Sequence, residues 1–208
     1  MTIKIYSRKM LKRLLTCFLL FTFCFLVIKD YAFASGPFIG DISVIKSSEN
    51  IAFSARLKGG ITKDIVEIIN SGAPTTFTYY IQLVRHRSGW FDSVEYSKTI
   101  KRSVKYNVLT KEYKFGEDVE DSIPQANKKN NVEKVTKDFD ELKKWLANLE
   151  SISLIPSKQI AAGDKYYISI KADLKTISLW FPFNYILFFV SFWDITTDWE
   201  VSSPFTAD

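Results

Sequence analysis

Apolar and polar side chains alternate along much of the chain after residue 50. A period of two predicts β-strands that place one face on a core and the other in water, as in antiparallel sheets. The apolar positions of the clearest stretches are Ile51, Phe53, Ala55 and Leu57; Phe77, Tyr79, Ile81 and Leu83; the even-numbered residues from Val94 to Val108 except Lys98 and Arg102; and Tyr166, Ile168, Ile170, Ala172 and Leu174. The chain is therefore expected to be mainly β.

Two short helices are predicted between these strands, at residues 61–72 and 138–150. In the first, isoleucines recur at helical spacing, with Thr62 as the expected N-cap and Gly72 as the expected end. The second begins with Asp138 and Glu141 in capping-box spacing. Its expected inner side is formed by Phe139, Leu142, Leu146 and Leu149.

Together these elements predict a mainly β (β-rich α+β) single domain over residues 35–208. The expected architecture is a two-sheet antiparallel immunoglobulin-like sandwich with two short helices and a C-terminal apolar helical segment. Residues 116–134 have the sequence GEDVEDSIPQANKKNNVEK. This stretch is charged, poor in large apolar residues and interrupted by Pro124, so it is expected to be an exposed loop.

Residues 1–34 have the three parts of a secretory signal peptide. Residues 1–13 contain five basic residues and no acidic one, the apolar run LLTCFLLFTFCFLVI follows, and Ala-Phe-Ala at 32–34 provides the small residues that a signal peptidase reads. Cleavage before Ser35 is therefore expected. It predicts export to the periplasm of a Gram-negative bacterium, peripheral to the membrane. The alternative is that the segment is retained as an N-terminal membrane anchor.

The predicted signal peptide also accounts for the positive charge of the chain. It contains six of the 28 basic and one of the 23 acidic residues, which leaves 22 of each in residues 35–208. A formal net charge of zero provides no basic surface for nucleic acid. Both cysteines, Cys17 and Cys24, lie in the same segment, so residues 35–208 have no thiol for a disulfide, a metal site or a nucleophile.

An uncharged run of eighteen residues, 176–193, precedes an acidic C-terminal tail. It is at the short end of what crosses a bilayer, and Pro182 and Asn184 interrupt it, so a membrane span is not expected. Residues 179–193 are instead expected to face the membrane or a membrane partner, with a short helix at Phe183–Trp193, and packing on the domain's own core is the alternative. The expected contact residues are Trp180, Phe181, Phe183, Tyr185, Leu187, Phe188, Phe189, Phe192 and Trp193.

One group of polar and aromatic side chains is specific enough to be a candidate site. It comprises Arg85, Arg87, Trp90 and Asp92. Arg85 shares the core-side parity of the strand before it, which predicts a partly buried pair with Asp92 across the turn, and Trp90 is expected to cover the turn. The functional alternative is an arginine-lined site for a carboxylate or phosphate.

No catalytic motif accompanies this group in the sequence. His86 is the only histidine, and with no cysteine nearby it makes a poor triad or metal-ligand set. Asp194, Asp198 and Glu200 lack the spacing of a calcium loop. The sequence also contains no phosphate-binding glycine loop, nucleophile elbow or paired catalytic carboxylates. We therefore expect no enzyme activity, no cofactor and no metal.

Several segments resemble one bacterial family. They are LKGG at 57–60, SGAPTTFTYYIQLVRHRSGWFD at 71–92, KYNVLTKEY at 105–113, LKKWL at 142–146, GDKYYISIKADL at 163–174 and DW at 198–199. Together they are similar to the exported domain-of-unknown-function 4390 family over nearly all of residues 35–208. The resemblance implies an exported, predominantly β domain without an established activity, with genes often near membrane sensor kinases. The segment 179–193 is more apolar than the short loop of many relatives.

These features predict a non-catalytic, membrane-associated interaction or scaffold module. Its expected partner is the membrane surface or an envelope membrane protein, and not nucleic acid. A second interpretation is a periplasmic partner or regulator of a membrane protein such as a sensor kinase. A third is a small-anion binding protein or hydrolase that uses Arg85, Arg87 and His86.

Overall fold

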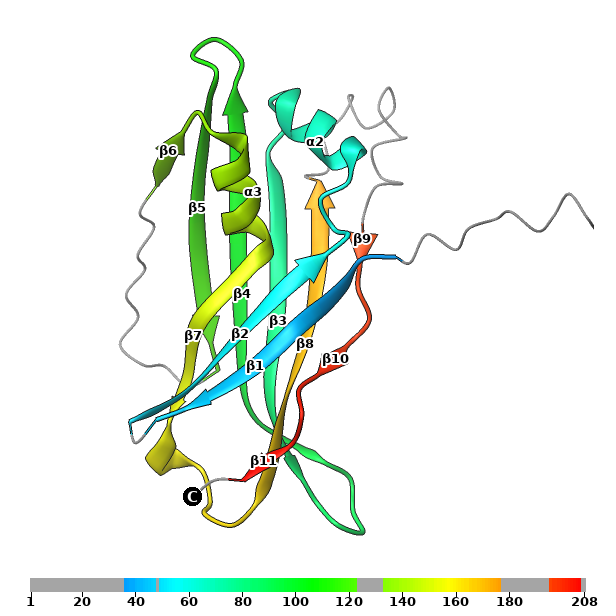
Figure 1. Cartoon of the computed structure of the whole chain (residues 1–208), viewed down its shortest axis with the longest axis vertical. Helices are drawn as coiled ribbons and strands as arrows, with labels where there is room; N and C mark the ends of the chain where they lie inside the picture. Colours follow the sequence, from blue (N-terminus) through cyan, green and yellow to red (C-terminus); the bar gives the residue numbers. More distant parts are fainter. Residues whose placement is uncertain (1–35, 48, 123–132, 177–194, 207–208) are drawn as a thin grey trace, which may run out of the picture. The chain divides into compact units, whose positions relative to one another are not determined.

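The computed structural model describes residues 36–47, 49–122, 133–176 and 195–206, which belong to one unit, Gly36–Asp208. It confirms a mainly β fold with two antiparallel sheets and two α-helices (Figure 1). Each stretch of alternating side chains noted above lies in a strand, except for Val108, the last residue of the third stretch, which is in the turn after β4. The period-two pattern was therefore a reliable guide to the framework.

The smaller sheet has the strand order β1-β2-β7, and the larger has the order β10-β8-β3-β4-β5-β6, with β9 and β11 also paired to β8. The small sheet contains β1 (Phe38–Lys46), β2 (Asn50–Lys58) and β7 (Asn148–Pro156). The large sheet contains β3 (Thr75–His86), β4 (Ser93–Asn107), β5 (Glu112–Asp121), β6 (Lys134–Thr136), β8 (Lys165–Thr176), β9 (Ile195–Thr196), β10 (Glu200–Val201) and β11 (Phe205–Thr206). A single 3₁₀ turn, Ser157–Gln159, follows β7.

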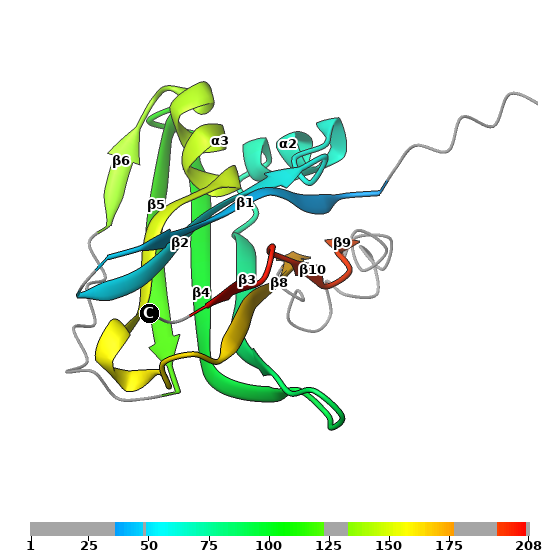
Figure 2. The same ribbon diagram turned by 60° about the horizontal axis from the view of Figure 1, so that its bottom comes forward.

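The two sheets share one hydrophobic core. The strands of the small sheet run obliquely across those of the large sheet, as Figures 1 and 2 show. The buried face of β2 contributes Phe53 and Leu57, and the facing side of the large sheet contributes Phe77, Leu83 and Ile168. Burial of these alternate positions provides the main stabilisation of the fold, since each large apolar side chain contributes about 1.5–3 kcal/mol.

The first predicted helix is present as α2 (Lys63–Asn70). The hydroxyl of Thr62 accepts the backbone N–H of Ile65 at 3.4 Å, as expected of an N-cap. Gly72 follows the helix with φ of +86°, a left-handed conformation that favours glycine. Both predicted boundary residues are confirmed.

Gly72→Ala should lower the free energy of unfolding by about 2 kcal/mol. An alanine at this position would be strained in the left-handed backbone conformation, and its Cβ atom would also press against a neighbouring atom. A Cβ atom at this position would lie 3.3 Å from the carbonyl oxygen of Tyr106. Gly163→Ala is the matched control: its φ is +84°, but a Cβ atom there would meet nothing within 4 Å. Urea denaturation should show a loss of about 1 kcal/mol for the control. Equal losses would exclude the steric contribution at Gly72.

The second predicted helix is shorter than expected. It forms α3 (Phe139–Ala147), and Asn148 is already extended, with φ of −99° and ψ of 123°. Leu149 belongs to β7 and pairs with Ala55 of β2, so the predicted helix end at residue 150 is wrong. Leu146 and Leu149 are three residues apart. This spacing fits two buried residues of one helix, and it fits equally well one buried residue at a helix end and one in the strand that follows. Only the pairing with β2 distinguishes the two.

The start of α3 confirms Asp138 as the N-cap but modifies the expected capping box. The Asp138 carboxylate accepts the backbone N–H groups of Asp140 and Glu141. In a capping box the Glu141 carboxylate would accept the backbone N–H of Asp138 directly. Here the Thr136 hydroxyl lies between them: it accepts the N–H of Asp138 and donates to the Glu141 carboxylate. A residue of β6 thus completes the cap and links the helix to the large sheet.

The predicted loop at 116–134 is wrong at both ends, while residues 123–132 lie outside the described part of the chain. β5 continues through residue 121 with β4 beside it, and Lys134 belongs to β6. The charges that indicated a loop instead form pairs across the strands. Arg102 lies 2.7 Å from Glu117, and Lys101 lies 2.7 Å from Glu120. Opposite charges facing one another make a charged strand stable.

The chain after residue 194 forms a broken edge strand along β8. Two buried hydroxyls replace backbone partners at its interruptions. The Thr197 hydroxyl accepts the N–H of Ala172, and the Ser202 hydroxyl accepts the N–H of Ile168, both at 3.0 Å. Such interruptions, with Pro204 nearby, blunt a sheet edge against further pairing.

The predicted apolar helix at Phe183–Trp193, and with it every expected contact residue from Trp180 to Trp193, lies outside the described residues. Within the ranges that the structure does describe, no helix combines the length and apolar character needed to cross a membrane. The membrane-facing role of 179–193 therefore stays a prediction.

Candidate functional site: the end of the β3–β4 hairpin

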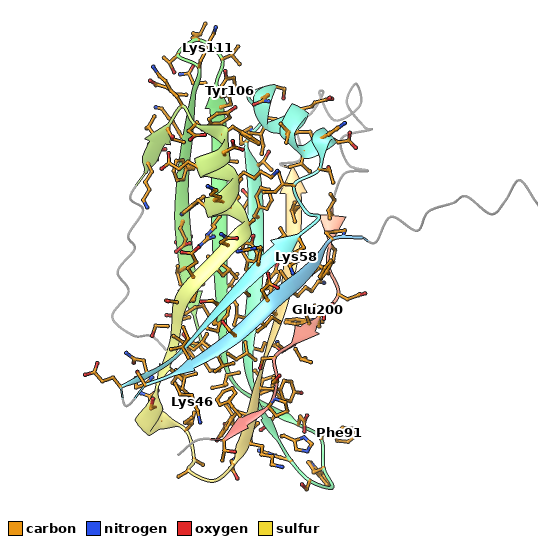
Figure 3. The ribbon with its side chains drawn as sticks, viewed as in Figure 1. Lys46, Lys58, Phe91, Tyr106, Lys111 and Glu200 are labelled. Carbon is orange, nitrogen blue, oxygen red and sulfur yellow. The ribbon has the colours of Figure 1, made fainter. Side chains whose placement is uncertain are left out.

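The candidate residues Arg85, Arg87, Trp90 and Asp92 all lie at one end of the β3–β4 hairpin. β3 ends at His86 and β4 begins at Ser93, so residues 87–92 form the turn between them. The hairpin extends at the lower end of the large sheet in Figure 1, and Figure 3 labels Phe91 there. The sequence therefore located the group correctly, although its internal contacts differ from those expected.

Asp92 anchors the turn. Its Oδ1 accepts the backbone N–H of Arg87 at 3.1 Å and lies 3.1 Å from Nδ1 of His86, while its Oδ2 accepts the hydroxyl of Tyr167 at 3.0 Å. The Arg87 N–H, followed by the Tyr167 hydroxyl, lowers the pKa of the Asp92 carboxyl below its ordinary value. Because Tyr167 belongs to β8, this carboxylate ties the turn to the neighbouring strand.

The predicted pair between Arg85 and Asp92 is wrong. Nη1 of Arg85 donates to Asp164 at 3.2 Å, and Nε lies 2.9 Å from Glu95 in an ion pair without hydrogen-bond alignment. The hydrogen bond from Arg85 to Asp164 raises the pKa of Arg85. Alternation along β3 explains the difference, since Arg85 and His86 point to opposite faces of the sheet and Asp92 lies on the His86 face.

Trp90 does not cover the turn, contrary to expectation. Trp90 is 74% exposed, and Phe91 is 85% exposed. The two rings contact each other edge to face, with centroids 6.4 Å apart. Val94, which follows them in the sequence, is 54% exposed. The β3–β4 pairing register shifts between Leu83 and Val84, and this shift turns Val94 away from the core, which Tyr96 faces.

A shallow hollow of about 470 Å³ lies beside the turn. Its lining residues are Arg85, His86, Arg87, Ser88, Gly163, Asp164 and Lys165. The guanidinium of Arg85 is already paired with Asp164 and Glu95, and Nη2 of Arg87 lies 3.9 Å from the same glutamate. These internal carboxylates compete with any bound anion, so the geometry does not favour the small-anion alternative.

The described ranges contain no group of three or more His, Cys, Asp or Glu side chains placed to hold a metal ion. The arrangement around Asp92 can orient His86, but within the described residues no nucleophilic side chain is hydrogen-bonded to this histidine. The polar contacts at the hairpin end thus hold strands together. Trp90 and Phe91 are left exposed beside these contacts.

Sequence reasoning missed four residues of this site: Phe91, Glu95, Asp164 and Tyr167. Phe91 had a visible signal, because it adjoins Trp90 in a polar, glycine-containing turn and connecting turns run over the protein surface. Glu95 reaches Arg85 through a strand register that the sequence does not predict. Asp164 and Tyr167 are separated from their partners, Arg85 and Asp92, by a long stretch of chain. Their roles required the pairing of β3 with β4 and β8.

One known family matches most of the chain. The family model named DUF4390, domain of unknown function, matches residues 34–202. The chain belongs to the DUF4390 family. The match includes the whole β3–β4 hairpin and most of the edge strand along β8, so the candidate site is part of the DUF4390 domain. No curated protein and no solved structure is detectably similar to the chain.

Proposed function

We propose that this DUF4390 chain is a non-catalytic interaction module of the cell envelope that makes contact through the tip of its β3–β4 hairpin. The observation that carries the proposal is the exposure of Trp90 and Phe91 at an otherwise fixed turn. Exposed aromatic residues that lie together are characteristic of contact sites, because their burial by a partner releases much apolar surface from water.

The contacts below the tip support an interaction role over a catalytic one. Asp92 joins the turn to β8, and Arg85 joins β3 to Asp164 in the segment before β8. Each pair restrains the backbone that carries the aromatic residues. A rigid contact element binds more tightly than a mobile one, since less conformational entropy is lost on binding.

The envelope location is part of the proposal. It is supported by the basic, apolar and small-residue regions of segment 1–34 and by the aromatic composition of 179–193. The partner is the membrane or a membrane protein, and regulation of a membrane protein such as a sensor kinase is the protein-bound form of the same role. The immunoglobulin-like description of the sandwich and the apolar helix within 179–193 also stay proposals.

Photo-crosslinking from the tip tests this function. The full chain, with photoreactive benzoylphenylalanine in place of Phe91, is expected to form adducts when irradiated in native envelope membranes. The Trp90→Ser change in the same chain should reduce adduct yield strongly, because the neighbouring ring is lost from the contact. Mass spectrometry of the adducts separates lipid from protein partners.

The opposite end of β4 provides a matched control. Leu109 lies in the β4–β5 turn and is 93% exposed, so the same photoreactive residue placed there is equally accessible. Adducts from position 91 and few from position 109 are the expected pattern. Absence of adducts from position 91 in membranes would overturn the proposed contact.

A further inference from the structure

Resting on the proposed function, we infer that the partner of the β3–β4 tip is the lipid interface of a membrane, with Trp90 and Phe91 at the boundary between headgroups and acyl chains. In this arrangement Arg87 and Lys165 face anionic lipid phosphates. The inference combines three features of the described residues: the chemistry of the tip, the charges around it and the way in which the turn is held.

The chemistry of the tip matches a lipid interface. Trp90 and Phe91 are the most exposed aromatic residues in the described ranges, and they lie in the turn between β3 and β4. Tryptophan combines an apolar ring with an N–H donor, which suits the headgroup region of a bilayer. An apolar element at this depth enters about 5–10 Å into the headgroup and acyl boundary. A two-residue convex tip fits such a soft surface without a preformed pocket.

The charges around the tip favour anionic lipid. The nearby carboxylates are partly exposed but already paired within the protein: Asp92 accepts three contacts, and Glu95 and Asp164, whose side chains are 34% and 45% exposed, pair with Arg85. By contrast, Lys165 has no ion-pair partner among the described residues and is exposed. Nη2 of Arg87 reaches Glu95 only at 3.9 Å. The charges left available to a partner are therefore positive, and each basic group near an anionic surface strengthens binding.

The turn is held so that the aromatic pair faces outward before any partner arrives. The backbone N–H of Trp90 donates to the carbonyl of Arg87 at 3.3 Å, and Gly89 adopts φ of +82°. Asp92 then fixes the turn to Tyr167. Because the aromatic side chains need no folding step to become accessible, insertion into lipid loses little conformational entropy.

The other end of β4 lacks this combination and so provides an internal comparison. Its turn exposes Val108 and Leu109 but no aromatic residue. Figure 3 shows Phe91 and Lys111 at opposite ends of the large sheet. β4 separates them by about 50 Å at 3.3 Å per residue. A label at one end therefore reports on that end alone.

The test uses the full chain with Cys17→Ser, Cys24→Ser and Ser88→Cys, labelled at position 88 with an environment-sensitive fluorophore. Vesicles of phosphatidylglycerol and phosphatidylethanolamine should shift the emission to the blue, and lipids carrying a quencher in the upper acyl chain should quench it. A local probe is required because segments 14–28 and 179–193 are also apolar. Thr110→Cys, labelled in the same background, should show neither change.

Trp90→Ser with Phe91→Ser should raise the lipid concentration at half-maximal shift by about a hundredfold, since two aromatic side chains are no longer buried. Val108→Ser with Leu109→Ser is the matched control and should leave it unchanged. Phosphatidylcholine vesicles should require more lipid than anionic ones, and equal binding would overturn the role assigned to Arg87 and Lys165. Circular dichroism verifies that both double variants are folded.

The outcome separates this inference from the proposed function. No shift or quenching at position 88 with pure lipid would overturn lipid as the partner. If position 91 nevertheless forms protein adducts in native membranes, the interaction function stands with a protein partner. If position 91 forms no adduct of either kind, both fail.

Discussion

Replacing Arg102 with Met is expected to lower the free energy of unfolding by about 3–4 kcal/mol, the largest effect of any single change considered for this chain. The side chain is only 5% exposed and lies on the inward face of β4. Nε donates to Glu117 at 2.7 Å, and Nη1 donates to the carbonyl oxygens of Asn148 at 2.7 Å and of Trp145. Its removal leaves these acceptors unpaired in a largely apolar setting.

Arg102 joins β4 to α3 and to β7, neither of which pairs with β4 through backbone hydrogen bonds. Its partners lie in β5, at the end of α3 and at the start of β7, so one guanidinium links the large sheet to the helix and the small sheet. The guanidinium also lies 4.9 Å from the ring centre of Trp145 and 5.9 Å from that of Tyr79. Arg102→Lys should recover little of the lost free energy of unfolding, because a lysine ammonium cannot reproduce the planar arrangement of N–H donors in the guanidinium.

Urea denaturation of Arg102→Met and Lys105→Met measures the effect. Lys105 lies on the same strand but is exposed and faces Lys114, so its replacement should change the free energy of unfolding by less than about 0.5 kcal/mol. A loss below about 1 kcal/mol for Arg102→Met would contradict the bridging role. Retention of α3 and β7 protection in hydrogen exchange would contradict it as well.

The second large effect is expected at the edge strand along β8. Thr197→Val together with Ser202→Ala should lower the free energy of unfolding by about 2–5 kcal/mol, because the buried N–H groups of Ala172 and Ile168 lose their acceptors. The two sites are about 13 Å apart along β8, so their effects should add. Ser203→Ala is the control, since Ser203 is exposed and the structure describes no hydrogen bond of its hydroxyl.

Hydrogen exchange provides a residue-specific measurement of this second effect. The amides of Ile168 and Ala172 should exchange faster in the double variant, and those of β3 should follow only to the extent that global stability falls. Unchanged exchange at both amides would mean that other acceptors replace the hydroxyls. In that case the edge strand would depend on its backbone bonds alone, from Thr197 to Ala172 and from Ser202 to Ile168.

The local pattern of apolar and polar residues was sufficient to predict those strands and helices in which buried positions recur at one regular spacing. β2, β3 and β8 each bury alternate residues on one face, and α2 lies between a capping threonine and a left-handed glycine. In these segments neighbouring residues along the chain determine both the conformation and the buried side. The same residues carry the resemblance to DUF4390, so family and framework were both visible in the sequence.

Only the tertiary structure decided the elements whose local signal was ambiguous. Leu149 fits either the end of a helix or the start of β7, and pairing with Ala55 selects the strand. The charged residues 116–121 were typical of a loop until β4 placed opposite charges beside them. At the hairpin end, the sequence grouped Arg85 with Asp92. Strand register instead placed Asp92 with His86 and Tyr167, and left Trp90 and Phe91 exposed, because these contacts join residues that the local period cannot relate.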